Sequence, residues 1–240
     1  MGSGTVFERY EIKYIITEKQ KELIKNGMEK YLAPDKYGRS VIRNIYYDTA
    51  DSRLIRRSNE KPVYKEKLRV RSYKRVESDD ETVFVELKKK YNSVVYKRRT
   101  VLSENTAAKW LNDGQLPQEQ TQIISEIECF RRFYGSLVPS AFVSYDREAF
   151  FAVDGSDFRV TFDENISART TDLSLKKDVG GEKLLGNGLV LMELKTHSGI
   201  PLWMTSLLSE NEIYKTSFSK YGTAYRTMIF PEKGEIKNVC

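Results

Sequence analysis

The chain is poor in cysteine and histidine. Its 240 residues contain two cysteines, Cys129 and Cys240, and a single histidine, His197. Two cysteines form neither a disulfide framework nor a cysteine-rich metal site. One histidine argues against a Ser-His-Asp triad and against a His-rich metal centre. Function therefore has to be sought in the charged residues and in the strand pattern.

Long apolar runs are also missing. No stretch approaches the roughly 18 apolar residues that a membrane span needs, and no charged-then-apolar secretory signal stands at the start. We therefore expect a cytoplasmic protein without a membrane segment of its own, although a partner could still anchor it to a membrane.

The charge excess is modest. Forty Lys and Arg against 34 Asp and Glu give a net charge of +6. This balance only mildly favours an anionic partner, so the distribution of the charges matters more than their sum. Eleven Phe, 15 Tyr and a hydrophobic share of 40% are enough to build a real core.

Cations gather on one face of the stretch Lys65–Arg75 when it is interpreted as a strand, because side chains of a strand alternate between two faces. The cationic face would carry Lys65, Lys67, Arg69, Arg71, Tyr73 and Arg75. Such a row repels itself unless water or an anion lies against it. For one strand alone, a solvated outer face is the simpler interpretation.

Other segments repeat this two-faced pattern. We expect strands at 7–16, 41–47, 65–75, 82–90, 94–102, 141–151, 158–163 and 189–196. We expect helices at 17–32, 103–114, 117–137, from Pro201 onward and at 217–229, a short helical piece within 48–59, and a loop at 172–188. Trp110 and Trp203 fall in helical apolar stripes, which favours packing over nucleotide stacking. The predicted class is α+β, with one domain at 7–230 and tails at 1–6 and 231–240.

The polar faces of these strands share a composition rich in Lys and Arg with a few Glu. They carry Arg9, Glu11, Lys13, Lys67, Arg69, Arg71, Glu86, Lys88, Lys97, Arg99, Arg147, Arg159, Glu193 and Lys195. Two arrangements fit this pattern. Helices could cover the apolar face of an open sheet whose charged face meets water, or about eight antiparallel strands could close into a barrel with the charges lining a tunnel and the helices outside.

A charged tunnel requires a wet interior that holds an anion, because so many like charges in a dry interior would cost several kcal/mol each. Phosphate chains suit such a tunnel, since Arg and Lys supply charge-assisted hydrogen bonds and scattered carboxylates can hold a divalent metal. The pattern alone leaves both arrangements open.

A series of motifs resembles the polyphosphate polymerase (VTC) domain, which belongs to the CYTH-like triphosphate tunnel metalloenzymes. In chain order the motifs are 7–14, 45–49, 67–73, 83–88, 97–99, 145–150, 158–163, 192–195 and 217–221. Each is weak alone, but nine in the same order cover nearly the whole chain.

The resemblance implies roles for individual residues. It makes Lys88, Arg69, Arg71 and Lys97 the catalytic cations. It implies phosphate or nucleotide contacts for Lys13, Arg147, Arg159, Ser219 and Lys220. The strand pattern adds Arg99 and Lys195 to this set. Arg43 is a further candidate for such a contact, but it shares its face with apolar neighbours, which leaves its role open. Glu193, with Glu11 as a second candidate, would hold Mn²⁺ or Mg²⁺.

The implied reaction is metal-dependent transfer of the γ-phosphoryl group of ATP to a growing polyphosphate chain. Some positions depart from the family pattern: Arg9 replaces the first Glu of the superfamily's Glu-x-Glu-x-Lys strand, and Ser217 stands where some members have Lys. The base expected before Arg69 is best matched by Arg57, in an uncertain register.

Two other functions fit the same residues. A tripolyphosphatase or nucleoside triphosphatase would use the tunnel for hydrolysis, and a non-catalytic module would bind polyphosphate or inositol phosphates without needing a metal. Nucleic-acid binding is not expected, because the aromatic residues mostly alternate onto the apolar faces and form no stacking platform.

Overall fold

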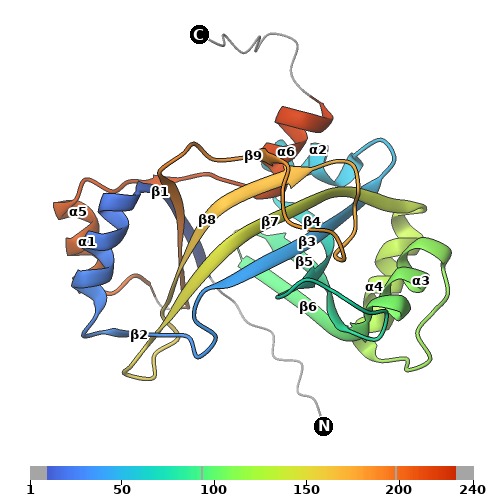
Figure 1. Ribbon diagram of the computed structural model, residues 1–240, viewed down its shortest axis with the longest axis horizontal. Helices are drawn as coiled ribbons and strands as arrows, with labels where there is room; N and C mark the ends of the chain where they lie inside the picture. The colour runs from blue at the N-terminus through green and yellow to red at the C-terminus, as the bar shows by residue number, and fades with distance from the viewer. Residues whose placement is uncertain (1–9, 93, 198, 231–240) are drawn as a thin grey trace.

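The computed structural model describes residues 10–92, 94–197 and 199–230. The predicted tails at 1–6 and 231–240, and with them Arg9 and Cys240, lie outside the described residues. Figure 1 shows the described chain as a curved sheet with helices around its outside.

One antiparallel sheet of eleven strands dominates the described part of the chain. The strands are β1 (Tyr10–Thr17), β2 (Leu32–Pro34), β3 (Ser40–Thr49), β4 (Tyr64–Ser72), β5 (Thr82–Tyr91), β6 (Val94–Ser103), β7 (Leu137–Ala152), β8 (Arg159–Arg169), β9 (Glu182–Lys183), β10 (Leu189–Thr196) and β11 (Lys215–Thr216). Their order is β11-β1-β10-β8-β7-β3-β4-β5-β6, with β2 paired to β7 and β9 to β8. The α+β class with an antiparallel sheet and external helices is therefore confirmed.

The sheet curls until its two ends meet, but hydrogen bonds do not close it in the described residues. Register shifts at Tyr46/Tyr47 and between Ser144 and Asp146 help it to bend. Strands β1 and β6 come into contact. Across this seam, Lys88 Nζ on β5 lies 2.6 Å from Glu11 Oε2 on β1. An ion pair thus completes the wall where a backbone ladder is missing.

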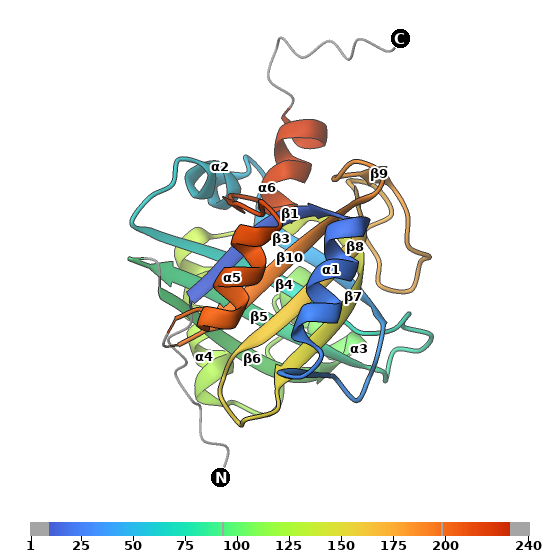
Figure 2. The ribbon, with the colours of Figure 1, turned by 90° about the vertical axis from the view of Figure 1, so that its left-hand side faces the viewer.

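Two helices cover one end of the outer face, α1 (Glu18–Met28) and α5 (Leu202–Glu210) (Figure 2). The helix α1 begins at a capping box. The Thr17 side chain accepts a hydrogen bond from Gln20 N, and the Gln20 side chain accepts one from Thr17 N. The apolar faces of both helices pack on β1, β8 and β10 in a cluster that includes Ile24, Met204 and Phe162.

A second pair, α3 (Glu104–Asp113) and α4 (Gln122–Tyr134), covers the other end over β4, β5 and β6 (Figure 1). Trp110 is fully buried in this cluster, and Trp203 stacks on Tyr31 with ring centroids 4.2 Å apart. Both tryptophans are packed among hydrophobic residues, as the helical stripes predicted.

The third cluster lies at one end of the curled sheet. There α2 (Arg53–Asn59), α6 (Lys220–Ala224) and the π-helical turn η1 (Tyr225–Ile229) pack against β3, β7 and β10. Tyr46 and Tyr221 stack with ring centroids 4.5 Å apart. These apolar residues fill that end of the sheet, so the polar interior is confined to the remainder.

Several predicted boundaries were wrong. The helix expected at 117–137 occupies only Gln122–Tyr134, because Thr121 caps its start and Gly135, with φ of 78°, follows its end. The helix expected at 17–32 ends at Met28, and β2 follows. The segment 217–229 becomes helical only after Ser219, and the strand expected at 65–75 ends at Ser72. The 172–188 loop contains the two-residue strand β9.

The buried cluster under α3 and α4 generates a stability prediction. Trp110→Ala should lower the free energy of unfolding by about 3–5 kcal/mol, because it removes a fully buried aromatic side chain and leaves a cavity. Phe133→Ala on α4 is a matched control, since Phe133 is 70% exposed and should change stability by less than about 0.5 kcal/mol. Urea unfolding followed by circular dichroism measures both. Equal losses for the two variants would contradict the assigned core.

Candidate functional site

A cavity of about 1170 Å³ runs inside the curled sheet. Of the described residues, fourteen cations line it: Lys13, Lys65, Lys67, Arg69, Arg71, Lys88, Lys90, Lys97, Arg99, Arg147, Arg159, Lys195, Lys215 and Lys220. Only three described carboxylates do so, Glu11, Asp35 and Glu193. The interior is therefore strongly positive.

Strand register places these cations in rows. Lys67 on β4, Lys88 on β5 and Lys97 on β6 stand directly opposite one another, as do Lys65 and Lys90. Like charges directly opposite in a sheet destabilise it. Lys67 has no carboxylate within ion-pair distance among the described residues, and its Nζ donates to Ser219 Oγ at 2.9 Å. An anion bound against these lysine rows would reduce the repulsion between their charges.

The neighbouring row has a carboxylate at its centre. Glu86 is 1% exposed and stands between Arg69 and Arg99 in the register. Its oxygens lie 2.7 Å from Arg69, 2.6 Å from Lys97 and 3.0 Å from Arg99. Burial opposes its charge, but Arg69, Arg71 and Lys97 hold the pKa of Glu86 well below its usual range. This carboxylate orients the cations around it and is fully engaged.

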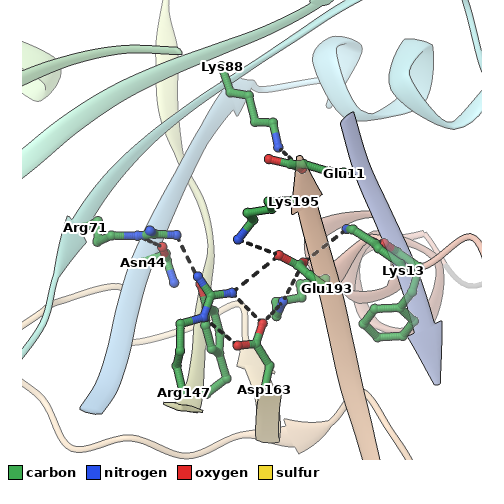
Figure 3. Close-up of polar contacts among 12 residues, drawn as sticks. Glu11, Lys13, Asn44, Arg71, Lys88, Arg147, Asp163, Glu193 and Lys195 are labelled. Atoms are coloured by element: carbon green, nitrogen blue, oxygen red, sulfur yellow. Dashed lines mark hydrogen bonds and ion pairs between the residues drawn. The ribbon is translucent and has the colours of Figure 1, made fainter. Parts of the chain in front are cut away.

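A second group of charges crosses the sheet at β7, β8 and β10 (Figure 3). Asp163 is completely buried and accepts two hydrogen bonds of 2.6 Å from Arg147. Glu193 is held more loosely. Its carboxylate oxygens lie 3.2–3.6 Å from the side-chain nitrogens of four cations, Lys13, Arg147, Lys195 and Lys220. Asp163 is thus saturated by short bonds, whereas Glu193 faces the cavity and can exchange partners.

The segment before α6 brings a hydroxyl and an ammonium to the same place. Ser219 caps α6 through Gly222 N, and Lys220 reaches Asp163. Tyr221 fixes this helix, because its hydroxyl donates to Asp48 Oδ2 at 2.9 Å. Buried Asp48 in turn accepts from the backbone of α2.

Burial and crowding shift the pKa values of several lysines. Burial lowers the pKa of Lys97 to about 7, with Arg69 and Arg71 adding to the effect. Burial likewise lowers the pKa of Lys195 to about 8, and that of Lys67 falls well below its usual value. Burial opposes ionisation of Glu11, yet Lys88 and Lys195 bring its pKa to about 2. Some lysines are therefore incompletely protonated near neutral pH, while Glu11 is charged.

Most residues that the sequence singled out lie on the cavity. These are Lys13, Arg69, Arg71, Lys88, Lys97, Arg99, Arg147, Arg159, Lys195, Ser219 and Lys220, together with Glu11 and Glu193.

Arg43 is the exception, because it does not line the cavity, and its phosphate contact stays a prediction. Residues 40, 42 and 46 of β3 line the cavity, so Arg43 lies on the opposite face with Ile45 and Tyr47. It cannot contact a ligand inside the sheet.

Sequence reasoning gave too little weight to other residues. Lys65, Lys67 and Lys90 line the cavity. Alternation placed Lys65 and Lys67 on the cationic face, but neither they nor Lys90 was given a role in the site. Lys215 stands on a two-residue strand that has no sequence signal. The structural roles of Glu86 and Asp163 depend on cross-strand neighbours, which a single strand cannot reveal.

The curled antiparallel sheet defines a fold class that two solved structures share. A Bacillus halodurans protein provisionally assigned as an adenylate cyclase has this fold, with a TM-score of 0.53, 12% identity, and coverage of 89% of this chain and 96% of that chain. The Hippeastrum protein HpAC1, provisionally called an adenylyl cyclase and described as having a dominant triphosphatase activity, gives a TM-score of 0.55 at 16% identity, over 92% and 95% of the chains.

Within this class the family can be stated. The VTC domain family matches residues 8–229, and the chain belongs to it. No curated protein matches the sequence.

Two further features, a membrane-spanning helix and a cluster of metal ligands, were sought among the described residues. No helix among them has the length and apolarity to cross a bilayer. They also contain no group of three or more His, Cys, Asp or Glu side chains that could hold a metal ion.

The lowered lysine pKa values predict proton uptake on anion binding. A bound phosphate chain should raise the pKa of Lys97 and of Lys195, so affinity should fall as pH rises from about 7 to 9, by up to roughly tenfold per pH unit for each lysine that titrates. Calorimetric titration with tripolyphosphate in two buffers of different ionisation enthalpy measures the protons taken up.

Lys97→Arg is the matched variant. Because arginine stays charged throughout this pH range, the variant should take up fewer protons on binding, by the amount that Lys97 contributes. Identical heats in both buffers for the wild-type protein would contradict the lowered pKa values.

Proposed function

We propose that the protein is a metal-dependent polyphosphate polymerase, which transfers the γ-phosphoryl group of ATP to a growing polyphosphate chain in the tunnel. The observation that carries the proposal is the excess of lumenal cations over carboxylates. A triphosphate has on the order of four negative charges near neutral pH. Fourteen described cations line the cavity, and five described carboxylates, Glu11, Asp35, Glu86, Asp163 and Glu193, line it or pair with these cations, so more positive charge remains than a triphosphate neutralises. A longer phosphate chain would use the remaining cations.

The chemistry needs no nucleophilic side chain. Phosphoryl transfer through a loose transition state depends on positioning and on neutralising the charge of the phosphoryl oxygens. Arg69 and Arg99 are held in place by Glu86, and Arg147 by Asp163. Preorganised guanidinium groups of this kind can bind phosphate oxygens with two parallel hydrogen bonds. The terminal phosphate of the acceptor chain would be the attacking group.

The residues present fit a divalent cation that is shared with the substrate. Mg²⁺ and similar ions are commonly bound by one or two carboxylates with phosphate oxygens completing the shell. Glu193 would hold Mn²⁺ or Mg²⁺, and Glu11, on the neighbouring strand β1, is the second candidate. When bound, the metal would neutralise phosphate charge and orient the chain. ATP as the phosphoryl donor suits a cytoplasmic location, and an anchoring partner at a membrane is compatible with it.

Hydrolysis is the second candidate. The observation that favours it is the triphosphatase activity described for HpAC1, which shares the fold. A hydrolase must activate water as the nucleophile, and in the described part of the cavity neither histidine nor cysteine is available for this. Few lumenal carboxylates remain for that purpose, because Glu11 is paired with Lys88.

A product assay separates these functions. Incubation with ATP and Mn²⁺ should give long polyphosphate chains and ADP, seen on a polyphosphate-stained gel. Arg99→Ala should lower the rate by at least about a hundredfold, because it removes one of the positioned lumenal cations. Arg98→Ala is the matched control, since Arg98 pairs with Glu126 outside the lumen and should change the rate less than about twofold.

Release of orthophosphate without polyphosphate by the wild-type protein would replace the polymerase with a hydrolase. Equal losses in the two variants would show that the lumenal position of Arg99 does not matter.

If Glu193 holds the metal, its substitution should affect phosphate-chain binding and metal-dependent turnover differently. Glu193→Gln should abolish Mn²⁺-dependent turnover, yet retain or strengthen binding of tripolyphosphate in EDTA, because it removes a negative charge from among four cations. Calorimetry in EDTA and the gel assay with Mn²⁺ measure the two properties. Unchanged turnover in this variant would point to a phosphate-chain module or enzyme that does not use Glu193 for a metal.

A further inference from the structure

Arg43 is a buried cation whose Nε has no hydrogen-bond acceptor among the described residues. It stands in the middle of β3 on the outer face of the sheet and is 9% exposed. Its Nε is buried without a hydrogen-bond acceptor, and none of its contacts with described residues is a hydrogen bond or an ion pair. Burial lowers the pKa of Arg43, and the charge of Arg75 lowers it further. This guanidinium therefore differs from the cavity arginines Arg69, Arg99 and Arg147, which are paired with carboxylates.

The nearby carboxylates are already engaged. Asp178 and Asp146 are the acidic groups that act on Arg43 electrostatically. Asp178 lies 2.7 Å from Arg75, and Asp146 lies 2.8 Å from both Arg39 and Asn165. Both partly offset the charge of Arg43, but neither forms an ion pair with it.

Hydroxyl groups flank Arg43 on the same face. Ser72 on β4 and Ser144 on β7 are its direct cross-strand neighbours, and directly opposed residues in an antiparallel sheet share a face. Ser144 continues the row to Ser167 on β8, with the two Oγ atoms 3.0 Å apart. The Ser72 hydroxyl already donates to Lys74 O, so the Arg43 guanidinium and the Ser144 hydroxyl are the donors on this face.

The 172–178 segment is fastened at the two sides of this row. Arg75, just beyond β4, donates to Lys176 O at 2.8 Å, and Arg169 at the end of β8 donates to Asp178 O at 2.8 Å. Figure 1 shows the β8–β9 connection passing in front of β7 and β3. The segment shelters the row from bulk water while its own carboxylate at Asp178 is tied to Arg75.

We propose that Arg43 and the adjacent serines form a second oxyanion site, on the outer face of the sheet and separate from the tunnel, that takes a single phosphate group. The Nε of Arg43 is buried without an acceptor, which is costly, whereas an apolar residue of similar size would carry no such cost. A tetrahedral oxyanion accepts more hydrogen bonds than a carboxylate and matches the planar fork of arginine flanked by hydroxyls. The phosphate can be free orthophosphate or the end of a phosphate monoester.

The tunnel is first saturated with tripolyphosphate, so that added phosphate can bind only elsewhere. Protein saturated with tripolyphosphate in EDTA is titrated calorimetrically with orthophosphate and, separately, with phenyl phosphate. The wild-type protein should bind one further phosphate, and Arg43→Met should weaken this binding by about tenfold or more, as expected for loss of a charged hydrogen-bonding partner. Binding of orthophosphate alone indicates a site for free phosphate, and binding of both indicates room for esters.

Two variants complete the design. Ser144→Ala should weaken binding by a few fold, and it tests the site if Arg43→Met does not fold. Arg39→Met removes a nearby exposed cation that is paired with Asp146, and it should change affinity by less than about twofold.

The proposal is overturned if the saturated wild-type protein takes up no further phosphate, or if Arg43→Met binds it as tightly. Failure of tripolyphosphate to bind the tunnel would instead count against the proposed function. The orthophosphate affinities of wild type and Arg43→Met would still decide the outer site.

Discussion

Repulsion among the cations inside the sheet is the constraint on which the rest of the structure depends. Directly opposed lysines on β4, β5 and β6 raise the free energy of the folded state. Glu86 and Asp163 counter this repulsion, each buried and each bound to several cations. These two carboxylates stabilise the arginines together with Lys97 and Lys220. Among the described residues Lys67 has no ion pair, so its charge depends on water or an anion.

The apolar clusters outside the sheet supply the stability that the interior lacks. Three separate clusters pack against the outer faces and one end of the sheet. Because each strand has one face in such a cluster, its alternate residues are forced toward the cavity. The same packing that stabilises the fold therefore concentrates the charges, and the functional interior follows from the hydrophobic exterior.

Much of this could be predicted from alternation along the strands. The class, most strand positions and most cavity residues follow from it. Arg43 shows its limit, because one cation among apolar neighbours matches the chemistry of the site while facing away from it. The pairing of Glu86 with cations from two neighbouring strands depends on register, which turns and bulges determine. Lys215 and Ser219 come from short irregular segments, whose positions are fixed only by tertiary packing.

The seam between β1 and the β5–β6 edge has a mechanical consequence. A barrel closed by backbone hydrogen bonds has a circumference fixed by its number of strands and their stagger. Here the Lys88–Glu11 ion pair spans the gap, and its strength depends on ionic strength and on what competes for Lys88. A phosphate chain that binds Lys88 would weaken the closure beside it. The width of the bore at this seam therefore depends on an ion pair that a bound anion can disrupt, and not on a backbone ladder.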